Sequence, residues 1–262
     1  MLKLSLLQST PTVVVAVILF LLLIVFFIFG YRLRIRTLRR SENKIIEDLS
    51  AINGTLLGLL ALLLAFTFGM SNSRYDTRRQ LVIEEANAIG TVILRTDVYP
   101  DSVRILFRSQ LKDYVEARIA FYEAGMDVQK IVERFYQADA ISKKIWSMTA
   151  AYAKIDPTTT RTSELIPALN AMIDVTTTRR AAGEATIPDS IMYFLFILCL
   201  CSAFLLGYDH KNKFDWIIVI GFSLMLSSTV FTIMDLDRPR SGLIDLDIPN
   251  EKIVELRDFF NE

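Results

Sequence analysis

The segment LLGLLALLLAFTF, residues 56–68, carries no charge and lies within an uncharged stretch that runs from Leu49 to Ser73. An α-helix rises about 1.5 Å per residue, so about 20 apolar residues cross the roughly 30 Å of hydrocarbon in a bilayer. Because the stretch lacks the alternation of a barrel strand, only a helix would satisfy its backbone hydrogen bonds in lipid. We therefore predict a membrane-spanning helix at about residues 51–73.

Three other stretches have the same character. No charge occurs between Lys3 and Arg32, from Ser190 to Tyr208, or from Trp216 to Met234. The first of these is longer than the apolar region of a signal peptide and is followed by arginines instead of a cleavage site, so we interpret it as a retained anchor. The further predicted spans cover about residues 12–31, 189–208 and 215–234.

The composition of the chain excludes several classes of function. Of the 262 residues, 52% are hydrophobic and 22% are charged, whereas a water-soluble domain carries about 25% charged residues. The 29 basic and 29 acidic side chains cancel, so no net charge attracts nucleic acid. Two cysteines and one histidine give no disulfide framework or haem attachment. We find no catalytic motif, and we predict neither an enzyme nor a cofactor.

The segment between the second and third spans, residues 74–187, is rich in charge and has no long apolar run. Its apolar residues recur at helical spacing, which predicts helices. One helix is expected to begin at Pro100, a second near Asp127 and a third at Glu164. The TTTRTS stretch at residues 158–163 is predicted to be a turn.

No cluster of glycine or proline separates the second span from the residues that follow it. We therefore predict that one helix of about 40 residues continues from the span to about Arg95. Pro188 is expected to open the third span.

The predicted fold is all-α, with four transmembrane helices and an extramembrane helical bundle inserted between the second and third spans. We divide the chain into a first transmembrane pair with its basic loop (residues 1–73), the bundle (74–187), a second transmembrane pair (188–236) and a tail (237–262). In the tail, Asn250 is predicted to cap a short amphipathic helix.

The basic residues favour one orientation in the membrane. The loop at residues 32–50 and the turn between the third and fourth spans lie on the same side and are rich in lysine and arginine. The positive-inside rule places both in the cytoplasm of a bacterial inner membrane, which leaves residues 74–187 outside.

The second span has two distinct faces. At about 100° per residue, one line along the helix passes from apolar to hydroxyl to cationic side chains. This line consists of Asn53, Leu57, Leu60, Leu64, Thr67, Ser71, Arg74 and Arg78. The adjacent face carries small residues that would let another helix approach closely, namely Gly54, Gly58, Ala61 and Ala65.

Two interpretations of the first line compete. In one, its leucines contact lipid or other helices, and its arginines anchor the helix at the membrane surface. In the other, several copies of the helix surround a pore. The leucines would then form a hydrophobic constriction, and Arg74 and Arg78 a ring that concentrates anions.

The stretch from Gly58 to Arg95 resembles the second span and following helix of the bestrophins. The matching positions are Phe68, Gly69, Asn72, Ser73, Tyr75, Asp76 and Arg78. With EEANAIGT at residues 84–91 and LDRPRSG at residues 236–242, nearly the whole chain is more similar still to the bacterial bestrophin-like membrane proteins.

This resemblance implies a pentameric channel for inorganic ions, mostly anions. Its neck would be lined by Leu57, Leu60, Leu64, Thr67 and Ser71. The resemblance also implies a cytosolic helical domain, on the side opposite to the one that the basic residues favour.

We therefore expect a homo-oligomeric ion channel lined by the second span, in contact with membrane lipid and more selective for anions than for cations. The alternative is a non-conducting, membrane-anchored helical sensor or scaffold module. The absence of charge within the four spans favours this alternative, because transport pathways usually carry charged groups. A closed ring of subunits would support the channel, and a monomer or dimer the module.

Two groups of acidic residues are candidate ion sites. Glu84 and Glu85, with Asn87, could bind Ca²⁺ through oxygen atoms, but a solvated helix face paired with basic neighbours is the simpler interpretation. Asp235 and Asp237 lie with two arginines at the end of the fourth span, where an interfacial salt bridge and turn is expected. We predict no metal site.

Overall fold

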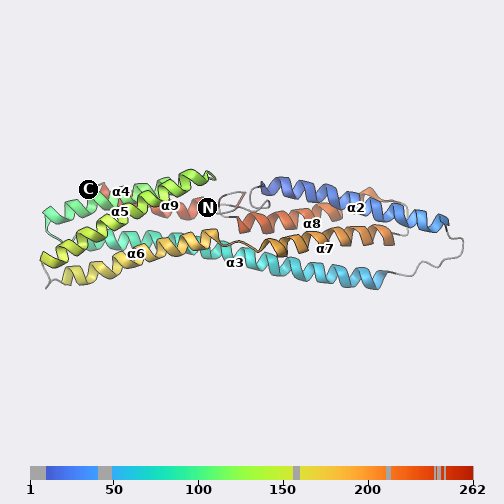
Figure 1. Ribbon diagram of the computed structural model, residues 1–262, viewed down its shortest axis with the longest axis horizontal. Coiled ribbons are helices and arrows are strands. Elements are labelled where there is room, and N and C mark those ends of the chain that lie inside the picture. The colour runs from blue at the N-terminus through green and yellow to red at the C-terminus, as the bar shows by residue number, and fades with distance from the viewer. Residues whose placement is uncertain are drawn as a thin grey trace. The chain divides into compact units, whose positions relative to one another are not determined.

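The computed structural model describes residues 10–40, 49–155, 160–210, 214–238, 240, 243–244 and 246–261. All regular structure in these residues is helical, which confirms the all-α prediction. Figure 1 shows the helices in chain order. They are α2 (Thr12–Arg40), α3 (Ser50–Thr96), α4 (Asp101–Glu123), α5 (Val128–Ile155), α6 (Thr160–Glu184), α7 (Asp189–Asp209), α8 (Trp216–Asp237), α9 (Asp247–Val254) and a terminal 3₁₀ helix, η1 (Glu255–Phe260).

Four helical runs are long and apolar enough to cross a membrane, judged by length and composition. They are α2, α3, the run that ends with α7, and α8. The four predicted spans fall within these runs, which confirms them as candidate spans. The prediction that the second span continues as one helix is also confirmed, since α3 covers 47 residues.

The chain forms two compact units. Unit 1 comprises Met1–Tyr75 and Thr186–Ile244, and unit 2 comprises Asp76–Ala185 and Asp245–Glu262. Unit 1 therefore contains α2, the first part of α3, α7 and α8 (Figure 1). Its apolar interior includes Leu23, Leu60 and Leu195, each at most 2% exposed.

Two glycines bring the backbones of α2 and α7 into contact. A Cβ atom on Gly30 would lie 2.1 Å from the carbonyl oxygen of Phe204, and one on Gly207 would lie 2.1 Å from that of Phe27. Only glycine fits at such a distance, and close backbone approach is a main source of helix association in lipid. By contrast, a Cβ atom on Gly54 or Gly58 would meet nothing within 4 Å.

Unit 2 packs the second part of α3 with α4, α5 and α6, and the C-terminal α9 and η1 complete its core. Ile89, Leu111 and Leu169 are fully buried in this core. Ile253 on α9 is also fully buried there, and Leu256 on η1 is 5% exposed. The C-terminal tail is thus part of the bundle's core.

Two local predictions about unit 2 were wrong. Thr160 already begins α6, so the described part of the TTTRTS stretch is helical, while Thr158 and Thr159 lie outside the described residues. Asn250 does not cap α9, which begins at Asp247. Instead, its side-chain oxygen accepts a hydrogen bond from Arg179 at 2.9 Å.

Candidate functional site

The line of α3 that was predicted to border a pore faces the interior of its own chain. Asn53, Leu60, Thr67, Ser71 and Arg78 are at most 6% exposed. The other members of the line, Leu57, Leu64 and Arg74, are partly buried. These residues therefore do lie on one face of a helix, as the spacing predicted. Within one chain, this is the face on which α3 packs.

The two arginines at the end of this line are bound within the chain. Arg74 Nη1 donates to Asp237 Oδ1 at 3.1 Å, and Asp237 also accepts from the backbone N–H of Ile187 at 2.9 Å. Arg78 donates from Nε to the carbonyl oxygen of Ala182 at 3.0 Å and from Nη2 to that of Ala185 at 2.6 Å. It thus satisfies backbone carbonyls at the C-terminal end of α6, where a cation also complements the helix dipole.

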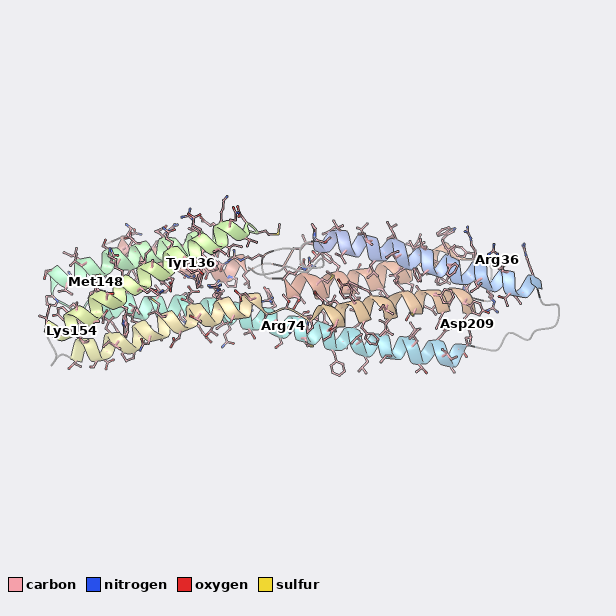
Figure 2. All side chains as sticks on the ribbon, in the orientation of Figure 1. Arg36, Arg74, Tyr136, Met148, Lys154 and Asp209 are labelled. Carbon is pink, nitrogen blue, oxygen red and sulfur yellow. The ribbon has the colours of Figure 1, made fainter. Side chains whose placement is uncertain are left out.

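A second polar contact ties three helices together at the other end of unit 1. Asn53 on α3 donates to Asp209 Oδ2 on α7 at 2.9 Å, and Arg34 on α2 donates to the carbonyl oxygen of Tyr208 at 2.8 Å. Figure 2 shows the labelled Arg74 and Asp209 at opposite ends of unit 1. Unit 1 is therefore held by polar groups at both ends and by apolar packing between them.

The acidic group at the end of α8 is structural, as expected. Asp235 is 1% exposed and accepts hydrogen bonds from the backbone N–H groups of Leu243 and Ile244 at 3.0 and 2.9 Å. Asp237 also forms an ion pair with Arg74, which confirms a salt bridge at this end of the span, whereas the turn stays a prediction. Pro239 and Gly242 of the same motif lie outside the described residues.

The opposite side of α3 is exposed. Leu59, Leu62, Phe66 and Met70 are 46%, 54%, 64% and 39% exposed, on a line roughly 125° from the buried one. The small residues Gly54, Gly58, Ala61 and Ala65 are exposed on the strip beside it. An apolar surface of this kind marks contact with lipid or with another protein chain.

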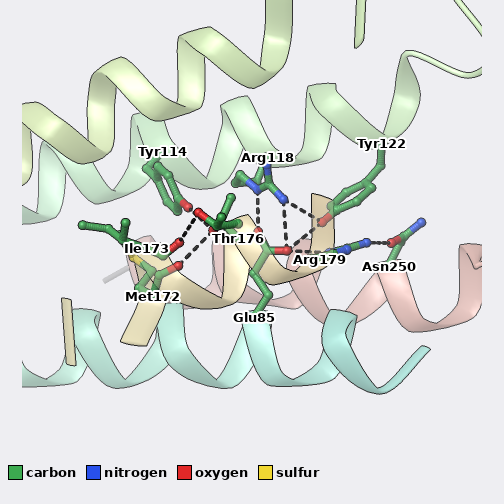
Figure 3. Close-up of polar contacts among 10 residues, drawn as sticks. Glu85, Tyr114, Arg118, Tyr122, Met172, Ile173, Thr176, Arg179 and Asn250 are labelled. Atoms are coloured by element: carbon green, nitrogen blue, oxygen red, sulfur yellow. Dashed lines mark hydrogen bonds and ion pairs between the residues drawn. The ribbon is translucent and has the colours of Figure 1, made fainter. Parts of the chain in front are cut away.

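In unit 2, Glu85 lies at the centre of a charged cluster (Figure 3). Its side chain is fully buried and accepts hydrogen bonds from Arg118, from Arg179 Nη1 at 2.7 Å and from the Tyr122 hydroxyl at 2.9 Å. The predicted solvated face is thus wrong for Glu85. It holds for Glu84, which is exposed and accepts from Gln80.

The cluster is covered by aromatic rings. The Arg118 guanidinium lies 4.7 Å from the centre of the Phe121 ring, and that of Arg179 lies 3.9 Å from the centre of the Tyr122 ring. Burial alone would lower the pKa of Arg118, but the charge of Glu85 raises it above its usual value. Burial also raises the pKa of the neighbouring Tyr114 to about 12. At neutral pH, Arg118 is therefore charged and Tyr114 is protonated.

The described residues contain no group of three histidine, cysteine, aspartate or glutamate side chains that could bind a metal ion. Sequence reasoning missed the role of Glu85, although a signal was present. Glu85 lies three residues after Val82 and four before Ile89, so it occupies a core position on the apolar face of α3. A charged residue at such a position indicates a buried ion pair.

Comparison with known proteins connects these features to a family. A family model described as the bestrophin-like domain matches residues 17–247. The chain is also similar in structure to a bacterial bestrophin homolog from Klebsiella pneumoniae, with a TM-score of 0.69, 14% identity, and coverage of 94% of this chain and 98% of that one. A single-substitution variant of that homolog has a TM-score of 0.71 and 13% identity, with coverage of 97% and 100%. None of the curated proteins matches the sequence.

Proposed function

The chain belongs to the bestrophin-like family, and from this premise we propose that it is a homo-oligomeric ion channel of the cell membrane in which α3 lines a shared pore. Unit 2 would lie outside the lipid as the extramembrane bundle. The observation that carries the proposal is the exposed apolar face of α3. The same helix packs another face, the line from Asn53 to Arg78, against its own subunit.

The proposal assigns the pore to a different face of α3 from the one the sequence indicated. A pore shared by several subunits can be bordered only by side chains that each subunit exposes. Leu59, Leu62 and Phe66 are exposed and apolar, and they would form a hydrophobic constriction that can close by dewetting. Thr55 and Ser73, on the same side of α3, would give polar entrances above and below it.

The buried line would then serve to hold α3 in place. Leu57, Leu60 and Leu64 would fix the helix against its own subunit, so that the exposed line of Leu59, Leu62 and Phe66 points to the common axis. The exposed strip of Gly54, Gly58, Ala61 and Ala65 would face a neighbouring subunit, where small residues permit close helix contact.

An anion-selecting ring of Arg74 and Arg78 is not part of the proposal. Both guanidinium groups are bound within the chain, one to Asp237 and one to the end of α6. Reversal potentials measured across a salt gradient would give the sign of the permeant ion.

Recordings from planar bilayers test the proposal. Purified protein should conduct ions, and Leu62→Ala or Phe66→Ala should increase the open fraction at least severalfold, because a wider and less apolar constriction stays wet. Leu60→Ala is the matched control. It removes a buried side chain of α3, so it should reduce stability and leave the open fraction of the folded protein unchanged.

Two outcomes would contradict the proposal. Bilayers that stay silent at all voltages, with a monomeric particle, would support the non-conducting module instead. A higher open fraction in Leu60→Ala but not in Leu62→Ala would indicate that the buried line, and not the exposed one, borders the pore. For the side of the membrane that holds unit 2, a cysteine at the exposed Ser147, in a background with Cys199 and Cys201 replaced by serine, can be tested with an impermeant maleimide in sealed vesicles.

A further inference from the structure

The turn between α4 and α5 exposes large apolar side chains. Met126 is 68% exposed, and Val128, the first residue of α5, is 49% exposed. Val132 follows one helical turn later on the same face of α5, at 43% exposure. Gly125, with a φ of 56°, permits the tight reversal of the chain that precedes Met126. Unit 2 therefore presents an apolar tip to its surroundings at this turn.

The turn lies at the end of unit 2 at which α3 enters the bundle (Figure 1). Near that end, the Arg180 guanidinium, close to the end of α6, lies 4.3 Å from the centre of the Phe135 ring on α5. At the far end, the centre of the Tyr152 ring on α5 lies 5.0 Å from that of Tyr99, which follows α3. The chain therefore runs along α5 in the same direction as along α3, and Val128 lies near the entrance.

The spacing along the chain places Val128 level with the first residue of α3 in unit 2. Tyr152 comes 24 residues after Val128, and Tyr99 comes 23 residues after Asp76. At about 1.5 Å per residue, the two starting points agree to within about one helical turn. The uncharged stretch of α3 ends at Ser73, three residues before Asp76. Because α3 is one unbroken helix, the end of its candidate span is about one helical turn from this level.

From this position and exposure we propose that Met126 and Val128 insert into the boundary between headgroups and acyl chains of the bilayer that α3 crosses. The inference rests on the proposed placement of unit 2 outside the lipid, but not on conduction. The contact needs little affinity of its own, because α3 already holds the chain at the membrane, and a few apolar side chains contribute to such binding. A second protein chain fits the tip less well, since a stable interface buries about 800 Å² on each partner.

The charges around the turn indicate the lipid chemistry. Residues 123–134 contain three acidic and two basic side chains, so no excess of positive charge attracts anionic lipid. We therefore expect an apolar contact that forms equally with zwitterionic phosphatidylcholine and with mixtures that contain anionic lipid. Inserted in this way, the turn would hold unit 2 to the membrane at a place besides its chain connections through α3 and α6.

Quenching of tryptophan fluorescence by brominated lipid tests the insertion. Met126→Trp is introduced into the full-length protein together with Trp146→Phe and Trp216→Phe. The protein is then reconstituted in vesicles of phosphatidylcholine that carries bromine at a chosen depth of its acyl chains. The matched control is Ile155→Trp, at the other end of α5, where the side chain is 80% exposed. We expect bromine near the headgroups to quench Met126→Trp severalfold more strongly than Ile155→Trp.

A further substitution shows whether Val128 shares the insertion. Val128→Asp adds a charge that is costly to place in lipid, so it should withdraw the turn and reduce the quenching of Met126→Trp severalfold. The same charge at the exposed Ser147, on the distant part of α5, should leave that quenching unchanged.

Weak quenching at both tryptophan positions would overturn the inference. Weak quenching of Met126→Trp with a blue-shifted emission would also overturn it, and would indicate that a second protein chain covers the turn. Strong quenching at both positions would overturn the placement of unit 2 outside the lipid as well. If the tryptophan variants fail to fold, a fluorescent label on Met126→Cys, with Cys199 and Cys201 replaced by serine, gives the same measurement.

Discussion

The two units bury their charged groups in opposite ways. Unit 1 keeps them at its ends, where Asp209 binds Asn53 and Asp237 binds Arg74. Between these ends its described interior is uncharged and mostly apolar, with a few buried hydroxyl groups such as that of Thr67. Unit 2 places Glu85 in its centre, between Arg118 and Arg179.

The difference follows from the surroundings that we propose for each unit. A charge in the middle of a bilayer is expensive, so a membrane bundle gains by moving charges to its ends. Its helices associate through close backbone contact, as at Gly30 and Gly207. A bundle in water already obtains its stability from apolar burial, and can hold an ion pair in its core if every charge is compensated. The variants below test this contrast, from the largest expected effect to the smallest.

Glu85→Ala should have the largest effect, because it removes the buried carboxylate that Arg118 and Arg179 both bind. We expect unit 2 to lose roughly 3–5 kcal/mol of stability. The chain has two tryptophans, Trp146 on α5 and Trp216 on α8. Denaturant unfolding followed by Trp146 fluorescence in a Trp216→Phe background therefore reports on unit 2.

The matched control for this variant is Glu84→Ala, which changes the exposed neighbour and should cost under about 1 kcal/mol. A similarly small loss of stability for Glu85→Ala would show that the central cluster contributes little to the stability of unit 2. The contrast between the two units would then have no energetic basis.

Gly207→Ala should destabilise unit 1 by roughly 2–3 kcal/mol. The added methyl group would collide with the backbone of α2, which cannot move aside as a side chain can. Trp216 fluorescence in a Trp146→Phe background measures this. Gly221→Ala on α8 is the control, since its Cβ meets nothing and alanine favours a helix. Equal effects at the two positions would mean that close backbone contact does not hold unit 1 together.

Arg74→Gln should cost roughly 1–2 kcal/mol, because it removes the ion pair of Asp237 at one end of unit 1 but leaves the bond from Ile187. Under the proposed function, the reversal potential of the channel should not change. A shift in reversal potential would instead show that Arg74 contacts the permeating ion.

The exposed pair of Glu116 and Arg257 should give the smallest effect. The hydrogen bond from Arg257 lowers the pKa of Glu116 below its usual 4.5. A lowered pKa in the folded state contributes stability above the unfolded value, and this contribution is lost as the pH falls through the folded value. The stability difference between the unaltered protein and Glu116→Gln should be under about 1 kcal/mol at pH 7 and should vanish on acidification. A difference that persists at low pH would rule out the ion pair as its cause.

Much of the fold could be predicted because the charge and hydrophobicity of a short stretch of sequence indicate whether that stretch can form a membrane-spanning helix. The uncharged stretches around Leu60, Leu195 and Leu226 gave the spans, and the absence of a breaker after Ser73 gave the continuous helix α3.

The orientation of α3 could not be predicted in the same way. Lipid, a neighbouring helix and a dewetted pore all accept leucine, so hydrophobicity alone does not tell Leu60 from Leu62. The glycine pattern does not identify the helix against which it would pack, so contact of Gly54 and Gly58 with a neighbouring subunit stays a prediction. Gly54 and Gly58 have the spacing of a packing motif, but within the chain the close contact is made by Gly30 and Gly207, which come from separate helices.

The packing of η1 in the core of unit 2 affects the order in which the protein can fold during synthesis. Leu256 belongs to the core of unit 2, yet α7 and α8 precede it in the chain. Because a ribosome works from the N-terminus onward, both of those helices are made before the bundle holds all its core side chains. A nascent chain that stalls before residue 256 would therefore expose an unfinished core to chaperones and proteases.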